Sequence, residues 1–206
     1  TLVLTLQNGL GNEAALAQHV APEQILGGLC FVCLNRVASG VIQHLDHGLV
    51  VLGEFGGPPR PRTTELAEAF IAAGVTCKVT EDLARAHWEK LVWNIPFNGL
   101  GVAAAAGWGA VAAGEVQPGA VPGAVLPTDR LLADARWAGQ VRELMLEVIR
   151  TSTALGKPIP EELADQMIAR TRTMGPYKAS TLLDFECGRP LEMEGLFLRP
   201  LQAAHA

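Results

Sequence analysis

The stretch "HWEKLVWNIPFNGLG", residues 87–101, decides how the rest of the sequence is interpreted. It has the composition of a buried helix, yet Lys90, Asn94 and Asn98 recur at every fourth position among apolar residues. Steps of four residues drift by only ~40° around a helix, so these three side chains share one narrow face. Asparagine is a poor helix former, and two of them one turn apart bring no evident gain in packing. The pattern therefore predicts a polar site on an otherwise apolar helix.

A structural interpretation of the same three residues stays open. Lys90 can lay its stem along the helix and keep its ammonium in water. The two asparagines can satisfy backbone groups near Pro96, which removes a donor from the helix.

The residues before this stretch alternate between strand and helix signals. Strands are expected at 1–7 and 25–34, a hairpin turning at Asp46-His47-Gly48, and a further short strand at 77–80. A helix capped by Thr64 is expected to run to Ala73. This alternation is typical of an α/β layer.

The residues from 81 onward give helical patterns. Helices are expected at 81–106, 129–155, after Pro160 to Arg172, at 180–187, and from Pro190. Residues 109–127 are mostly Ala, Gly, Val and Pro, which predicts an irregular connection. We expect a first domain at 1–80 and an all-helical second domain at 81–206. The first residues resemble the inside of a strand and the last resemble the middle of a helix, so a fragment of a longer protein is expected.

Composition limits the classes of function. With 206 residues, a net charge of −5 and a pI near 5.5, the chain lacks the basic clustering of a nucleic-acid-binding or anionic-membrane protein. No apolar run is long enough to span a bilayer and no leader opens the chain, so the cytoplasm is the expected location.

Metal and redox sites are not predicted. Cys30 and Cys33 spell C-x-x-C, but an offset of three in a strand directs the two side chains to opposite faces. His44 and His47 are interpreted as surface residues of the hairpin. His87, one turn before Lys90, is interpreted as an exposed helix histidine.

"GLGNEA", residues 9–14, fits the G-x-G-x-x-A pattern of a dinucleotide-binding loop. An acidic residue should then end the next strand about twenty residues on, where Cys33 and Asn35 stand instead. We therefore expect the phosphate-binding half of a nucleotide domain to be absent from these residues.

Three stretches in the same order resemble the ketopantoate reductases (2-dehydropantoate 2-reductases). "EKLVWNIPFN" is similar to their K-x-x-x-N-x-x-x-N helix, and "LTLQNGLGNE" to the strand and loop that end their nucleotide domain. "KASTLLDFECGRPLEMEG" resembles their S-M-L-Q-D-x-x-x-G-R-x-T-E segment, although Leu191 stands in place of the threonine. The resemblance implies the remnant of a Rossmann-type α/β domain, followed by an all-α C-terminal domain of the 6-phosphogluconate dehydrogenase type that is incomplete at its C-terminus.

The resemblance also implies a role for each site residue. Lys90 would be the general acid that protonates the ketone oxygen, and an ammonium with an ordinary pKa of ~10.4 starts protonated. The remaining expected site residues are Asn94, Asn98, Ser180 and Glu192, which would bind the substrate, and Asn8, which would lie where nicotinamide and substrate meet.

Structural interpretations remain for three of these residues. Ser180 is also placed to cap a helix, and Glu192 lies where a carboxylate suits the first turn after Pro190. Asn8-Gly9 is also an ordinary turn dipeptide.

The function implied is the NADPH-dependent reduction of 2-dehydropantoate, or of a similar 2-keto acid, in pantothenate and coenzyme A biosynthesis. The alternatives are another β-hydroxyacid dehydrogenase and a non-catalytic fragment that binds a small acid or dimerises. The expected partner is a small 2-keto acid, a homodimer is left open, and no metal is expected.

Overall fold

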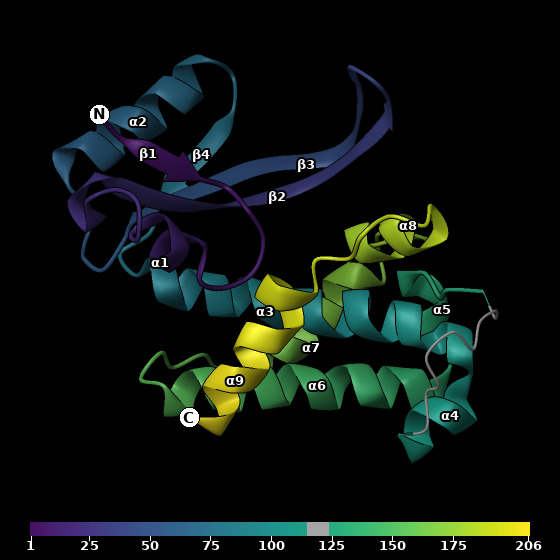
Figure 1. Ribbon diagram of the computed structural model, residues 1–206. Coiled ribbons are helices and arrows are strands. Elements are labelled where there is room, and N and C mark those ends of the chain that lie inside the picture. Colours follow the sequence, from purple (N-terminus) through teal and green to yellow (C-terminus); the bar gives the residue numbers. More distant parts are fainter. Residues whose placement is uncertain (115–123) are drawn as a thin grey trace. The chain divides into compact units, whose positions relative to one another are not determined.

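The computed structural model describes residues 1–114 and 124–206 (Figure 1). These residues form two compact units, Thr1–His87 and Trp88–Ala206. The division falls inside helix α3 (Leu83–Ala103), whereas the sequence placed a boundary near residue 80. A mixed sheet with helices is followed by a helical region, which confirms the predicted fold class.

The first unit contains a four-stranded sheet in the order β1-β2-β3-β4. Strand β1 pairs in parallel with β2, β2 pairs antiparallel with β3, and β3 pairs in parallel with β4. The strands are β1 (Val3–Thr5), β2 (Ile25–Ala38), β3 (Val41–Glu54) and β4 (Thr76–Val79). The two outer strands are short, so they pair with only part of the long central hairpin.

The hairpin turns at Ser39-Gly40, and the predicted turn at Asp46-His47-Gly48 is wrong. Gly40 has φ 73°, a conformation that glycine adopts without strain. His47 and Gly48 lie inside β3, where the pairing register shifts by a residue. Asp-x-Gly supplies positive φ for a bulge as well as for a turn, and here it makes the bulge.

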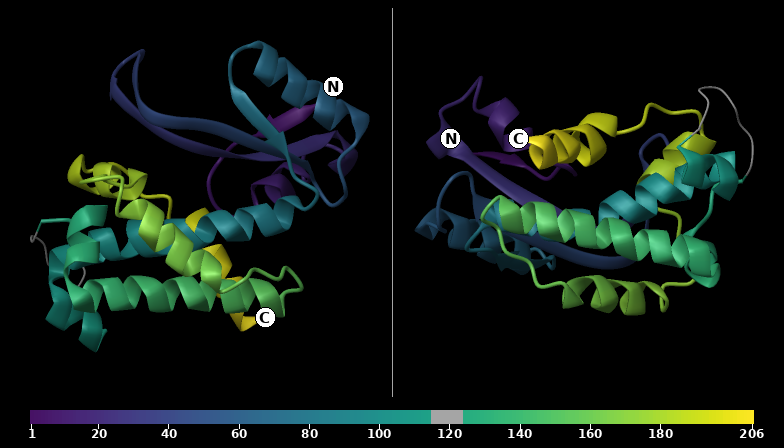
Figure 2. Two further views of the ribbon diagram at one scale, coloured as in Figure 1. Left: turned by 180° about the vertical axis from the view of Figure 1, so that it is seen from behind. Right: turned by 90° about the horizontal axis from the view of Figure 1, so that it is seen from below.

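The two faces of the sheet bind different helices. Val50 and Leu52 pack with Ala67 of helix α2 (Pro61–Ala72) and with Cys77. The alternate positions Gly27 and Gly53, which are register partners, face the other way, toward Leu83 of α3. Helix α1 (Asn12–Leu16) lies on this second face (Figures 1 and 2).

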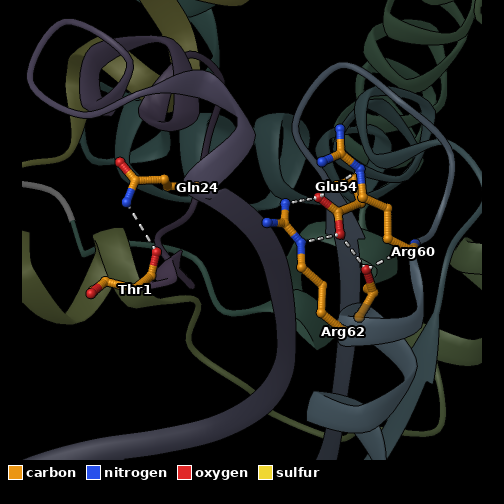
Figure 3. Close-up of polar contacts among 6 residues, drawn as sticks. Thr1, Gln24, Glu54, Arg60 and Arg62 are labelled. Atoms are coloured by element: carbon orange, nitrogen blue, oxygen red, sulfur yellow. Dashed lines mark hydrogen bonds and ion pairs between the residues drawn. The ribbon is translucent and has the colours of Figure 1, made fainter.

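The carboxylate of Glu54 joins the end of β3 to the start of α2 (Figure 3). Glu54 is buried and accepts hydrogen bonds from the Arg62 guanidinium and the Thr63 hydroxyl. The Thr63 oxygen in turn accepts the Arg60 backbone N–H at 3.2 Å. The helix therefore begins at Pro61, and the predicted cap at Thr64 is wrong.

The second unit is helical from Trp88 onward. The predicted helix at 129–155 is two helices, because the Asp134 carboxylate accepts the Arg136 backbone N–H and caps a new start. The elements are α4 (Trp108–Ala113), α5 (Thr128–Ala133), α6 (Ala135–Ala154), α7 (Glu162–Thr171), α8 (Ser180–Glu186), a π-helical segment (Glu194–Leu198) and α9 (Arg199–His205). Short 3₁₀ turns lie at Pro22–Gln24 and Ala104–Ala106.

Two further expectations need correction. Residues 109–113 are helical, not part of an irregular connection, and residues 115–123 of that predicted connection lie outside the described residues. The predicted helix start at Pro190 is wrong, because Leu191 and Glu192 are not helical and the helix begins at Met193.

Helix α8 packs closely on the second half of α3. Leu182 is buried with Val125 and Ala179, and Trp93 and Val102 of α3 pack against this cluster. A Cβ at Gly101 would lie 2.7 Å from Leu182, so glycine is needed for this approach. The Trp93 indole donates to the Thr171 hydroxyl at 2.9 Å and ties α3 to α7 as well.

Candidate active site

The polar face predicted along α3 lies in a mostly buried part of the helix. Asn94 is 7% exposed and Asn98 is 2% exposed, while Lys90 is half-buried. The neighbouring Leu91, Val92 and Phe97 are buried almost completely, so α3 is covered on its apolar faces as well. Both asparagines are therefore mostly buried, and any polar atom that loses contact with water needs a partner.

Both polar atoms of the Asn98 amide have hydrogen-bond partners within the fold. Its Oδ1 accepts the backbone N–H of Thr181 at 3.0 Å, and its Nδ2 donates to the Asn94 carbonyl at 3.0 Å. Thr181 lies in the first turn of α8, whose backbone N–H groups have no acceptors within the helix. Asn98 thus caps α8 from another element, and the alternative interpretation of Ser180 as the residue that caps this helix is wrong.

Asn94 differs, because its side-chain amide has no hydrogen-bond partner among residues 1–114 and 124–206. Neither polar atom of this amide is both buried and unpaired, so solvent reaches it although most of the residue is buried. An incoming ligand with carboxylate or hydroxyl oxygens would supply what this amide lacks.

Ser180 lies beside the residue through which Asn98 of α3 caps α8. It is the first residue of α8 and is exposed, and the next residue, Thr181, bonds directly to Asn98. Ser180 is therefore one residue from a backbone contact with Asn98, although the two residues are far apart in the sequence.

Glu192 is exposed and precedes the helical turn that begins at Met193. Its carboxylate has no hydrogen bond or ion pair with any residue that the structure describes. The following π-helical segment packs on α3, because a Cβ at Gly99 would lie 3.1 Å from the Phe197 ring. Such segments are frequent at functional sites, and this one lies against the residue that follows Asn98.

Asn8 belongs to the first unit, in the loop between β1 and α1. Its carbonyl accepts a hydrogen bond from the Asn12 side chain at 2.9 Å, and Gly9 and Gly11 beside it have φ of 87° and 84°. This loop follows the carboxyl end of a strand in a parallel pair, where α/β proteins bind their ligands.

Glu13 and His87 form a buried pair that the sequence interpretation missed. His87 was expected to be exposed but is 5% exposed, and its Nε2 lies 3.0 Å from Glu13 Oε1. Burial opposes ionisation of Glu13, but the hydrogen bond and charge of His87 outweigh it, so the pKa of Glu13 lies below its ordinary value. Nothing in the sequence signals a pair separated by 74 positions.

Other kinds of site find no support in the described parts of the chain. Across residues 1–114 and 124–206, no three His, Cys, Asp or Glu side chains gather closely enough to hold a metal ion. None of the helices described in those ranges is long and apolar enough to cross a membrane. The cysteines described are free thiols.

Comparison with protein families gives two matches. Residues 1–57 match the model described as ketopantoate reductase PanE/ApbA, and residues 123–206 match that of its C-terminal part. A 2-dehydropantoate 2-reductase of Nostoc is 36% identical over 98% of the chain and 59% of its own length. One of Halobacterium salinarum is 32% identical over 95% of the chain and 58% of its own length.

Solved structures give the same result. A 2-dehydropantoate 2-reductase of Geobacter metallireducens superposes with a TM-score of 0.86 and 43% identity. The match covers 100% of this chain and 62% of that protein. This chain thus spans about 60% of the length of the relatives that it matches.

Proposed function

Because this chain belongs to the ketopantoate reductase family, we propose that it carries the substrate-binding and proton-donating part of a 2-keto acid reductase that uses NADPH. The substrate is 2-dehydropantoate or a close relative, which gives the protein a place in pantothenate biosynthesis. The Asn94 amide lies four residues from Lys90 on α3 and has no hydrogen-bond partner among the described residues, and this is the observation that supports the proposal most directly.

Lys90 is the proposed general acid. Reduction of a ketone develops negative charge on its oxygen, and an ammonium near that oxygen stabilises the charge before the proton moves. Lys90 then donates its proton to the oxygen and is left as a neutral amine, to be reprotonated from solvent. The half-buried position of Lys90 suits both roles, because reduced contact with water strengthens the interaction.

The remaining side chains orient the substrate. Asn94 offers both a donor and an acceptor, Ser180 donates to the carboxylate, and Glu192 accepts from the hydroxyl that 2-dehydropantoate keeps beside its keto acid. Asn98 is assigned a different part from the one implied by the resemblance. Its oxygen already accepts the Thr181 N–H and its nitrogen already donates to the Asn94 carbonyl, so it positions α8.

The residues present fit only the nicotinamide end of a dinucleotide. Asn8 directly precedes Gly9 and Gly11, two loop positions with positive φ after β1, where the backbone can approach a ligand closely. When bound, NADPH supplies the hydride. A homodimer and a cytoplasmic location remain predictions.

The test is a substrate series with the complete protein. NADPH oxidation is measured with 2-dehydropantoate and with 2-ketoisovalerate, which lacks the hydroxyl. We expect kcat/KM to favour the hydroxylated acid by about tenfold or more, because a carboxylate placed for a hydroxyl is left unpaired without it.

Glu192→Gln and Ser180→Ala are expected to reduce the rate, and Glu192→Gln to weaken the preference for the hydroxyl. Glu194→Gln is the matched control, because this nearby carboxylate is exposed and pairs with Arg199. Absence of NADPH oxidation with every 2-keto acid would refute the proposal.

A further inference from the structure

The Glu13–His87 pair lies outside the residues to which a role has been assigned, and both partners are buried. Glu13 is in α1, His87 is in the first turns of α3, and each is 5% exposed. Because the pKa of Glu13 is lowered, its carboxylate is ionised and can only accept. Nε2 of His87 therefore carries the hydrogen of this bond.

The sheet beneath the pair leaves space for it. A Cβ at Gly27 of β2 would overlap Glu13 Oε1 and the side chain of Leu83. Gly53, the register partner of Gly27 on β3, likewise leaves room for Leu83, whose Cβ would lie 2.9 Å from a Cβ there. The register partners Gly27 and Gly53 thus let α1 and the first turn of α3 pack directly against the backbone of the sheet.

A chain of contacts continues from the pair to Asn8. Asn12 precedes Glu13 in α1, and its side-chain nitrogen donates to the carbonyl of Asn8 at 2.9 Å and to that of Gln7 at 3.5 Å. Movement of Glu13 would therefore be transmitted to the loop through α1. At the other end, His87 precedes Lys90 by three residues in the continuous helix α3.

Stability alone is a weak reason for this pair. Replacing a buried hydrogen-bonded pair with well-packed apolar residues is often neutral or stabilising, whereas a hydrogen-bonded pair fixes one geometry. The hydride must reach the carbon of a carbonyl and the proton its oxygen. The rate therefore depends on the geometry of the groups that align the donors with the substrate.

We propose that Glu13 and His87 are positioning residues, which fix the loop of Gln7–Asn12, and Asn8 with it, against the first turns of α3, Leu83–His87. The catalytic part of this inference rests on the proposed reductase function. The pair touches no reacting atom and acts through α1 and α3.

The test compares the apolar double variant Glu13→Leu/His87→Phe with wild type in the complete protein. The double variant is expected to keep its Tm, because the pair is replaced by apolar volume. Amide hydrogen exchange at residues 8–16 is expected to rise about tenfold or more, since the local opening free energy falls. The kcat is expected to fall about tenfold or more, as positioning is lost.

Glu13→Gln keeps an acceptor for the His87 N–H and is expected to recover most of the protection and the kcat. Glu54→Gln is the control for loss of a buried carboxylate in the same unit, because Glu54 contacts α2 and not this loop. It is expected to lower Tm while exchange at residues 8–16 and kcat stay as in wild type.

A double variant with wild-type Tm, exchange and kcat would overturn the proposal. If that variant does not fold, His87→Gln tests the proposal instead, because the flexible glutamine amide holds Glu13 loosely. Wild-type exchange and kcat in His87→Gln would overturn the proposal. If wild type itself reduces no 2-keto acid, the proposed function fails, but the exchange measurement still decides the role of the pair.

Discussion

Asn94 and Asn98 occupy successive turns of α3, but their amides have different surroundings. Asn98 is satisfied by Thr181 and by the Asn94 carbonyl, whereas the Asn94 amide has no partner among the described residues. Asparagine thus holds α3 and α8 together at position 98, whereas at position 94 its amide is available to a ligand.

Alanine substitutions should separate these two roles. Asn98→Ala leaves the buried Thr181 N–H without its acceptor, so the free energy of unfolding should fall by about 1–3 kcal/mol. Asn94→Ala should change it by less than about 1 kcal/mol, yet lower kcat/KM roughly 10- to 100-fold by removing a hydrogen bond to a charged substrate.

Urea unfolding and steady-state kinetics of the two variants provide the measurement, each variant serving as the control for the other. Equal destabilisation by both, with the kinetics of Asn94→Ala unchanged, would show that the two asparagines share one structural role.

The sequence could show that these residues share a face, because helical spacing is local information. It could not show which of them has a partner, since Thr181 lies 83 positions from Asn98. The same limit hid the Glu13–His87 pair, because histidine is intermediate in burial and its partner in α1 lies 74 positions away.

At the scale of elements, the helices were predictable and some of their boundaries were not. The helical period identified α3, α6 and α8, and the ends predicted at residues 155 and 187 lie one residue beyond the observed ends of α6 and α8. The hairpin turn was misplaced because Asp-His-Gly and Ser-Gly both supply turn residues, and the pairing between strands selects which one is used. The start predicted at Pro190 was wrong, since the chain becomes helical only at Met193, directly before the π-helical segment Glu194–Leu198.

The joint between β3 and α2 gives a prediction about pH. The hydrogen bond from Arg62 is the main reason that the pKa of Glu54 lies below its ordinary value; burial opposes this, and Thr63 adds to it. A carboxyl whose pKa is lower in the folded state stabilises the fold above the unfolded-state pKa, here near 4.5. That stabilisation is lost as the pH falls through the folded-state pKa.

The difference in unfolding free energy between wild type and Glu54→Gln should therefore be greatest near neutral pH and should shrink below about pH 4.5. Urea unfolding between about pH 7 and pH 3 measures it, with exposed Glu68→Gln on α2 as a control for loss of a surface carboxylate. A difference that grows on acidification would contradict the ion-pair account of this joint.

At the scale of the whole molecule, the two units differ in what they offer to a reductase. The unit Thr1–His87 contributes a loop at the carboxyl end of a parallel strand, and the unit Trp88–Ala206 contributes the buried polar face of α3. The matches to the two parts of the family lie one in each unit, in residues 1–57 and 123–206.

Turnover of the complete protein carrying Lys90→Ala tests the central claim most directly. Lys78→Ala is the matched control, because Lys78 is an exposed lysine on β4. Loss of a general acid predicts a fall in kcat of roughly 10² or more for Lys90→Ala, with Tm and the kcat of Lys78→Ala close to wild type. Wild-type kcat in the Lys90→Ala enzyme would contradict the account.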